Sequence, residues 1–364
     1  MKITKFFALI AAAATMFVGC QEPTDDNGQG GGDPSATSDI TLSAAEMVEV
    51  NTPIEFTITN SEGEDVTAEA TIYDKSHDFV PVSNPFTPTE DGDYTFYAVV
   101  GDSISKDIKV VVTPVVPAIP EDSDVANTSF VHHILLVDHT GNTCGYCPGM
   151  MRALKEVAET EGYHEKYYEA MAHSYANTDP AYSGSASAIS TYFRITGYPT
   201  LTYNFNTILT SGPTADHIKQ QIDALWKESA DAGVAAATSM ATKSVVVNSE
   251  VKAAVTGEYS ITAWLLEDGI EAIQSQGDDW MDIHNNAIRQ AAITSPITGY
   301  ELGTIEAGKC TTRVLNLKIT SSKWVRDNMK VMLIVSKKND KGVYDVANVV
   351  LCPMNDTVTY NYNN

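Results

Sequence analysis

Two cysteines separated by two residues are the part of this sequence best suited to chemistry. They occur in the run Ile134-Leu-Leu-Val-Asp-His-Thr-Gly-Asn-Thr-Cys-Gly-Tyr-Cys-Pro-Gly-Met, in which an apolar strand leads through a short loop into a helix. Backbone N–H groups and the helix dipole stabilise a thiolate at such a position. The second thiol lies one turn away, where it can resolve a mixed disulfide. The spacing predicts thiol–disulfide exchange, with Cys144 as the attacking thiolate and Cys147 as the resolving thiol.

The surroundings of this pair resemble the thioredoxin superfamily. Asp138 precedes Cys144 by six residues, and Thr196-Gly-Tyr-Pro-Thr-Leu201 looks like the loop and strand that carry the family's cis-proline. The resemblance implies that Asp138 is a buried carboxylate that accepts the proton of Cys147. It also implies that Pro199 follows a cis bond and shapes the substrate groove beside Cys144.

Two departures from thioredoxin leave the direction of the reaction open. Thr143 replaces the usual tryptophan before the first cysteine, and Gly145-Tyr146 replaces Gly-Pro between the cysteines. The intervening dipeptide tunes the reduction potential of the pair. No dissociable cofactor is expected, because the dithiol itself carries the electrons, and the substrate would be a protein thiol or disulfide.

The same cysteines have other interpretations. They can form a disulfide that is only structural. A zinc site would need two more ligands, and a strand places the nearby His132, His133 and His139 on mixed faces, so no metal is expected. Covalent haem attachment is excluded, because Pro148 and not histidine follows the second cysteine.

Strands and helices alternate over residues 129–232, an order that predicts an α/β layer. The helix at 214–226 is the most regular, since Thr214 can cap it and its apolar residues recur on one face. The expected elements are strands at 130–137, 167–173 and 200–206, and helices at 148–162, 186–193 and 214–226.

The regions on either side are predicted to be β-structure. Over residues 38–116, segments such as Ile54-Glu-Phe-Thr-Ile-Thr59 alternate apolar and polar residues. Asp91–Gly101 looks like the late strands of bacterial Ig-like domains, which implies an N-terminal Ig-like β-sandwich. Residues 117–128 are expected to be a linker. Residues 233–364 are predicted to form a C-terminal β-sandwich, which makes the fold class multidomain α/β plus β.

The N-terminus has the features of an export signal. Lys2 and Lys5 precede an apolar run that is shorter than the roughly 20 residues needed to span a bilayer. The run ends in Phe17-Val-Gly-Cys20, which resembles the lipobox of bacterial lipoproteins. The resemblance implies removal of residues 1–19 and lipidation of Cys20, followed by an acidic, Gly-rich tether at 20–37. Ordinary signal cleavage beside a bystander cysteine is the alternative.

Charge excludes some partners. The chain has a formal net charge of −24, and residues 20–128 contain 22 acidic residues against 3 lysines. Such a surface argues against binding to nucleic acid and against docking on anionic lipid. Two further cysteines, Cys310 and Cys352, could form a structural disulfide in an oxidising compartment, although nothing in the sequence indicates that they approach each other.

The chain as a whole resembles a narrower group. The lipobox, the acidic tether, the thioredoxin-like core and the C-terminal stretch His284-Asn-Asn-Ala-Ile-Arg289 look like the Omp-28-related outer-membrane lipoproteins of Bacteroidetes, over roughly residues 125–364. The resemblance implies a lipid-anchored protein of the outer membrane, on the cell-surface or the periplasmic face.

Two hypotheses about function follow. The first is thiol–disulfide oxidoreductase chemistry on protein thiols. The second is a non-enzymatic cell-surface binding or adhesion lipoprotein that uses the thioredoxin-like fold as a scaffold, since fold alone does not determine function. The state of Cys144 discriminates between them, because a scaffold would have a buried or slowly reducible pair.

Overall fold

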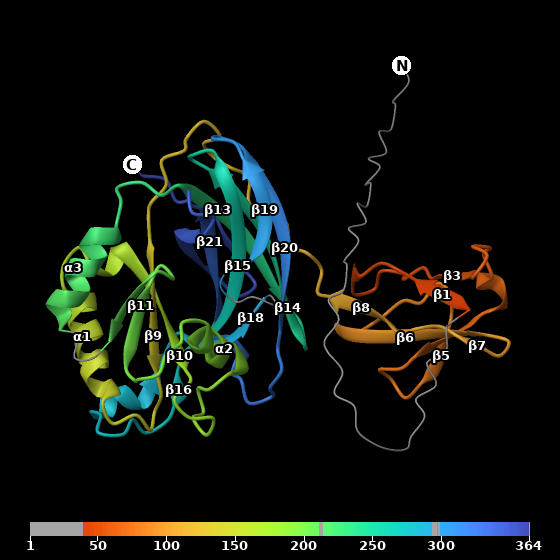
Figure 1. Ribbon diagram of the computed structural model, residues 1–364, viewed down its shortest axis with the longest axis horizontal. Helices are drawn as coiled ribbons and strands as arrows, with labels where there is room; N and C mark the ends of the chain where they lie inside the picture. Colours follow the sequence, from red (N-terminus) through yellow and green to blue (C-terminus); the bar gives the residue numbers. More distant parts are fainter. Residues whose placement is uncertain (1–38, 211–213, 293–296, 298, 364) are drawn as a thin grey trace. The chain divides into compact units, whose positions relative to one another are not determined.

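The computed structural model describes residues 39–210, 214–292, 297 and 299–363. The expected signal peptide, Cys20 and the tether lie outside the described residues. Within the described part the chain is mostly β, with three α-helices (Figure 1). None of its helices there is long and apolar enough to cross a membrane.

Residues 40–113 form two antiparallel-rich sheets, one of order β1-β3 and one of order β2-β8-β6-β4-β5, with β7 paired to β6. Alternate residues of β6 point into a core that includes Tyr94, Phe96 and Ala98, while the residues between them are only partly buried. This is the period of two that the sequence shows. The elements are β1 (Ile40–Ser43), β2 (Met47–Glu49), β3 (Thr57–Asn60), η1 (Thr67–Glu69), β4 (Thr71–Asp74), β5 (Val80–Val82), β6 (Gly92–Val100), β7 (Ser103–Ile104) and β8 (Ile108–Thr113).

The α/β part is built around a completely buried strand, β9. Strand β10 lies parallel to it and β11 antiparallel, and the local order is β12-β11-β9-β10. Ile134 and Leu136 of β9 face helices α1 and α3, whereas Leu135 and Val137 face α2, so helices cover both faces of the sheet (Figure 1). The elements are β9 (Ile134–Thr140), α1 (Cys147–Glu159), η2 (His164–Lys166), β10 (Tyr167–His173), α2 (Gly184–Tyr192), β11 (Thr200–Tyr203), β12 (Thr207–Thr210) and α3 (Ala215–Leu225).

The three expected helices form within a few residues of their predicted bounds. Thr214 caps α3 as expected, because its side chain accepts a hydrogen bond from the N–H of His217. Ser183 caps α2 in the same way, through the N–H of Ala186. Short polar side chains at these positions satisfy N–H groups that the helix itself leaves free.

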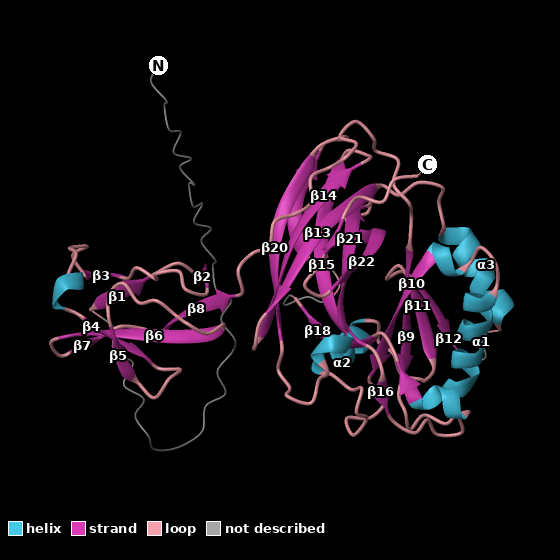
Figure 2. Ribbon diagram, turned by 180° about the vertical axis from the view of Figure 1, so that it is seen from behind, coloured by secondary structure: helices cyan, strands magenta, loops and turns pink. Residues whose placement is uncertain are grey.

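The same sheet continues into the C-terminal part of the chain. A parallel contact between β10 and β18, at Met171 and Ala287, extends it through β18-β15-β21-β22, with β19 paired to β15. Strands from both sides of the expected boundary at residue 232 therefore belong to one nine-stranded sheet (Figure 2).

A second sheet, of order β20-β14-β13-β23, packs against this extension through a core of valine, leucine, alanine and isoleucine side chains. The remaining elements are β13 (Ala232–Met240), β14 (Ser244–Ala253), β15 (Gly257–Glu267), β16 (Ile270–Glu271), η3 (Asp279–Asp282), β17 (Ile283–His284), β18 (Ala287–Ala291), β19 (Tyr300–Ile305), β20 (Cys310–Lys318), η4 (Arg326–Asn328), β21 (Met329–Lys338), β22 (Tyr344–Pro353) and β23 (Thr357–Val358).

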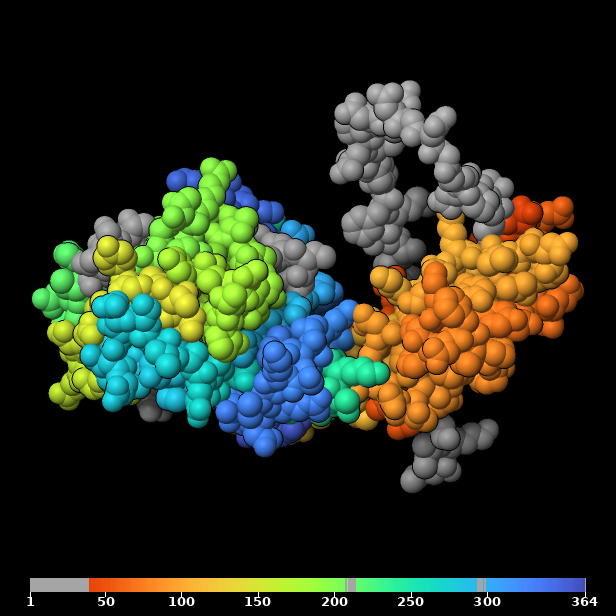
Figure 3. All heavy atoms as spheres, turned by 90° about the horizontal axis from the view of Figure 1, so that it is seen from below, coloured from red at the N-terminus to blue at the C-terminus, as the bar shows by residue number. Residues whose placement is uncertain are grey.

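The connection from β15 to β18 extends from the C-terminal region to the disulfide loop and helix α1 of the α/β part. We call residues 268–286 the strap. Its ends pair as the two-stranded ribbon of β16 and β17, and its middle contains the short helix η3. In the space-filling view the strap, in cyan, lies against the yellow segment that contains α1 (Figure 3).

Candidate functional site

Cys144 and Cys147 form a disulfide, with their Cα atoms 5.5 Å apart. Cys147 is the first residue of α1, and Pro148 follows it in the first turn, where its missing N–H breaks no helical hydrogen bond. The N–H of Cys144 donates to the carbonyl oxygen of Gly141, which closes the loop between β9 and the helix. The sequence therefore predicted the placement of both cysteines at the strand-to-helix junction.

Both sulfur-bearing side chains are buried. Cys144 is 2 % exposed and Cys147 is 0 % exposed, although Tyr146 between them is 86 % exposed. The strap packs against the loop that carries them, since the N–H of Ser275 donates to the carbonyl oxygen of Asn142. Gln274 Nε2 donates to the carbonyl oxygen of Cys144 at 3.1 Å and to that of Gly141 at 3.3 Å. With both side chains so deeply buried, a substrate thiol has little access to the disulfide in this structure.

The strap is also fixed to α1 and to its own base. Arg152 of α1 binds the carboxylate of Asp278 through two hydrogen bonds of 3.1 Å, and Lys155 lies over the ring of Trp280. The ring of His284 is bonded to the carbonyl oxygen of Ala272. The contacts with α1 are exposed to solvent, so they hold the strap less firmly than the buried bonds of Gln274.

Asp138 lies on β9 and is fully buried. Neither of its carboxylate oxygens has a hydrogen-bond partner in the described part of the structure. Burial raises the pKa of Asp138 well above its ordinary value, and the nearby Glu169 raises it further. Burial also raises the pKa of Glu169, to about 7. The environment therefore favours the protonated acid at Asp138.

Pro199 precedes β11, and the peptide bond between Tyr198 and Pro199 is cis. Thr200 pairs with His139, so Pro199 lies beside the end of β9 from which the disulfide loop departs. The hydroxyl of Tyr198 bonds to Ser174 at 3.1 Å.

The three histidines of the region occupy separate environments. Burial lowers the pKa values of His132 and His133 to about 4, and that of His139 to about 3. His139 bonds to the hydroxyl groups of Ser190 and Thr202. Burial thus favours the neutral form of all three rings.

The disulfide suggested for Cys310 and Cys352 is not formed. Both are free thiols, Cys310 exposed on β20 and Cys352 buried on β22. The two strands belong to different sheets, so the side chains are kept apart by the architecture of the sandwich.

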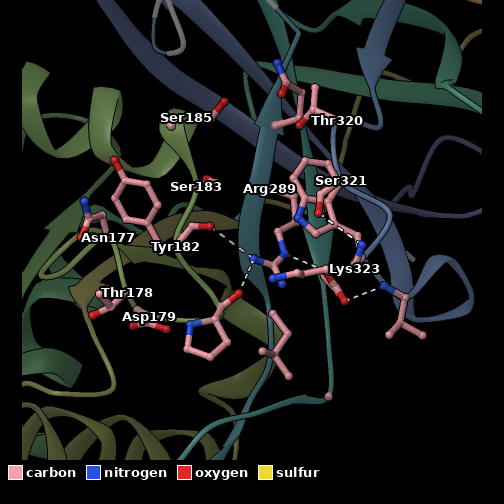
Figure 4. A pocket seen from close by; sticks show the side chains of 18 of the residues that line it. Asn177, Thr178, Asp179, Tyr182, Ser183, Ser185, Arg289, Thr320, Ser321 and Lys323 are labelled. Carbon is pink, nitrogen blue, oxygen red and sulfur yellow. Dashed lines mark hydrogen bonds and ion pairs between the residues drawn. The ribbon is translucent and has the colours of Figure 1, made fainter.

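A cavity of about 1040 Å³ lies beside α2, between segments 177–185, 267–271, 289–290 and 320–325 (Figure 4). An ion pair lies buried against it. Arg289 Nε donates to Glu267 Oε2 at 2.6 Å, and the two side chains are 4 % and 2 % exposed. Arg289 Nη1 donates to the carbonyl oxygen of Pro180, and Glu267 Oε1 accepts from the N–H of Val325. Four separate segments are thus tied together around one opening.

Asp179 connects the cavity to the disulfide loop. Asp179 lines the cavity, and its Oδ2 accepts hydrogen bonds from the N–H of Asn142 at 2.8 Å and from His173 Nδ1 at 2.7 Å. Burial acts to raise the pKa of Asp179, but the bonds from His173 and Asn142 outweigh it, and the pKa is lowered.

The sequence did not indicate Gln274, Glu267 or Trp324 as site residues. Gln274 contacts the disulfide loop, and Glu267 and Trp324 contact Arg289, all across long stretches of chain. No local sequence pattern marks any of the three. Arg289 and His284 stood in the stretch that resembled a family signature. They do not bond to each other: Arg289 pairs with Glu267, and His284 holds the strap.

Comparisons with known proteins found a family model that matches part of the chain and solved structures with a similar fold. The model of the family "Outer membrane protein Omp28" matches residues 186–354. The structure is similar to HBP35 of Porphyromonas gingivalis, with a TM-score of 0.52 and 18 % identity over 63 % of this chain and 77 % of that one. It also matches a membrane-anchored protein from Corynebacterium diphtheriae, with a TM-score of only 0.21 and 10 % identity over 90 % and 59 % of the two chains. No curated protein sequence matches.

The likeness to HBP35 concerns the fold alone, and the one to the Corynebacterium protein is too weak to carry an argument. The matched family is one of outer membrane proteins, and the outer membrane is the location of this protein, as the sequence predicted.

Proposed function

We propose that this chain is a lipid-anchored binding protein of the outer membrane, in which the disulfide is a structural part of a thioredoxin-like scaffold. The observation that carries the proposal is the burial of Cys144 and Cys147, in a loop whose backbone is bonded to the strap. Exchange requires a thiolate to attack a sulfur atom directly, and a covered disulfide reacts slowly for lack of access. The open cavity beside α2 offers the ligand site that such a protein needs.

The arrangement of β12-β11-β9-β10 supports a thioredoxin-like unit at residues 129–232. One antiparallel strand lies between the edge strand and the central strand, and α1 and α3 share one face while α2 covers the other. Residues 38–116 would be an Ig-like spacer, and lipid on Cys20 would anchor the chain. Each of these assignments belongs to the proposal.

An insulin-reduction assay tests the proposal. The wild-type protein and Cys144→Ser are expected to reduce insulin equally slowly, at the rate of dithiothreitol alone. Turnover by the wild type that Cys144→Ser abolishes would overturn the proposal in favour of enzymatic exchange.

A second candidate is thiol–disulfide exchange itself, favoured by the position of the disulfide at the start of α1. After an external dithiol had reduced the bond and itself become a disulfide, the Cys144 thiolate would attack a substrate disulfide and release one substrate thiolate. Cys147 would then attack the mixed disulfide, lose its proton to a base, and release the second substrate thiol with re-formation of the bond seen here. The resemblance assigns that base to Asp138, whose raised pKa means that it could accept the proton only at a pH high enough to ionise it. The strap would have to move away before either step.

A further inference from the structure

We propose that the cavity beside α2 binds a neutral, hydroxyl-rich ligand, namely a short oligosaccharide. The inference rests on the proposed binding function and names the class of ligand. The cavity has a volume of about 1040 Å³, at the upper end of the range of small-molecule sites, roughly 300–1,000 Å³. This is far larger than a single ion requires.

The buried charged side chains of the lining already have partners within the protein. Asp179 accepts hydrogen bonds from His173 and from the N–H groups of Asn142 and Ala181. Arg289 and Glu267 neutralise each other at 2.6 Å, and both have further backbone partners, so neither needs a charged ligand. At the rim, Lys323 and Glu271 are exposed and of opposite sign. The chain as a whole has a net charge of −24, which disfavours anions. The buried charges of the lining therefore need no charged group from a ligand.

Several polar side chains of the lining have unused hydrogen-bonding capacity. Within the described residues, the exposed side chains of Asn177, Thr178 and Thr320 and the hydroxyl group of the half-buried Tyr182 bond to no other group of the protein. In Figure 4, Asn177, Thr178 and Tyr182 stand on one side of Arg289, and Thr320 on the other. Hydroxyl and amide groups both donate and accept hydrogen bonds. A ligand whose own groups both donate and accept, as sugar hydroxyls do, matches this lining.

Two aromatic rings complete the site. Tyr182 and Trp324 line the cavity and are partly exposed. Arg289 Cζ lies 5.6 Å from the centre of the Trp324 ring, which holds the indole in place. Aromatic side chains contribute a large apolar contact area. The C–H faces of pyranose rings can pack on such surfaces while their hydroxyl groups meet the polar lining.

Isothermal titration calorimetry on the full-length protein tests the inference. The protein is kept in a detergent without a sugar headgroup, and the probes are maltotriose, cellotriose and N-acetylchitotriose, each to millimolar concentration. At least one probe is expected to bind with a stoichiometry of one. Thr320→Ala and Tyr182→Phe are each expected to weaken binding by about tenfold, the effect of losing one hydrogen bond.

The matched control is Thr304→Ala, which removes an equally exposed threonine hydroxyl from β19, outside the cavity lining. It is expected to leave binding unchanged, and thermal melts verify that each variant is folded. Absence of binding by all three sugars, or equal binding by the wild type, Thr320→Ala and Tyr182→Phe, would overturn the inference.

Citrate and spermidine, titrated in parallel, distinguish a wrong ligand class from a wrong binding function. If a charged probe binds in place of the sugars and Thr320→Ala weakens it, the ligand class is wrong but the binding function stands. The insulin assay tests the binding function independently, because it reports only on the disulfide.

Discussion

At the scale of single residues, the acid of Asp138 is buried without a hydrogen-bond partner among the residues that the structure describes. Its raised pKa means that the folded state resists ionisation, whereas the unfolded chain ionises near the ordinary value of 3.8. The contribution of protonated Asp138 to the free energy of unfolding is fully present below that value. It is lost as the pH rises toward the pKa of Asp138 in the folded state. Asp138 therefore destabilises the fold increasingly above about pH 4.

Replacement of Asp138 by asparagine is expected to weaken this pH dependence, because the amide does not ionise. The free energy of unfolding of the variant should gain on that of the wild type between pH 5 and pH 8. Urea titrations at both pH values measure the difference. Asp327→Asn, at an exposed position on η4, is the control. Parallel pH profiles for the wild type and Asp138→Asn would contradict the expectation.

The buried pair of Arg289 and Glu267 gives a second prediction at this scale. Arg289→Met leaves a buried carboxylate without its cation, and the free energy of unfolding is expected to fall by about 3–5 kcal/mol. The double variant Arg289→Met/Glu267→Gln should recover part of that loss, because no uncompensated charge remains. Denaturant unfolding measures both. A double variant whose loss equals the sum of the two single losses would exclude such coupling.

At the scale of elements, the strap determines access to the disulfide. Gln274→Ala removes the two bonds to the carbonyl oxygens of Gly141 and Cys144, and is expected to speed reduction of the disulfide by dithiothreitol several-fold. Release of free thiols with time gives the rate. Ile273→Ala is the control, since this strap side chain is 80 % exposed. Equal rates for all three proteins would show that the strap does not limit access.

Two glycines in different elements are expected to respond in opposite directions to alanine. In β13, a Cβ on Gly233 would lie 2.3 Å from the ring of Phe130, so Gly233→Ala should destabilise the fold by about 1–3 kcal/mol. In α1, a Cβ on Gly149 would meet nothing within 4 Å, so Gly149→Ala should stabilise it by about 0.5–1 kcal/mol. Thermal denaturation compares the two. A lowered Tm for Gly149→Ala, or an unchanged one for Gly233→Ala, would contradict the packing argument.

At the scale of the whole molecule, attachment to the membrane depends on the proposed lipid at Cys20. Cys20→Ser is expected to abolish incorporation of labelled palmitate and to release the protein from the outer-membrane fraction. A second variant, Cys310→Ser, changes a cysteine without a role in anchoring and should remain labelled. Labelling of Cys20→Ser at the wild-type level would exclude lipidation at this residue.

The sequence by itself determined the local features. Cys-x-x-Cys at a strand-to-helix junction and the three helices, with the cap at Thr214, follow from neighbouring residues and form as predicted. These features depend on periodicity, capping and turn residues, which act over a few positions.

Only the tertiary structure decided what covers the disulfide and what surrounds the cavity. Gln274 meets Cys144 across 130 positions, and Arg289 reaches Pro180 across 109. Such contacts arise because β10 and β18 join two regions into one sheet, which brings the strap over α1. The pairing of distant strands is a property of the whole fold, and no local pattern encodes it. The sequence thus located the cysteine pair, and the tertiary structure decided that the pair is buried.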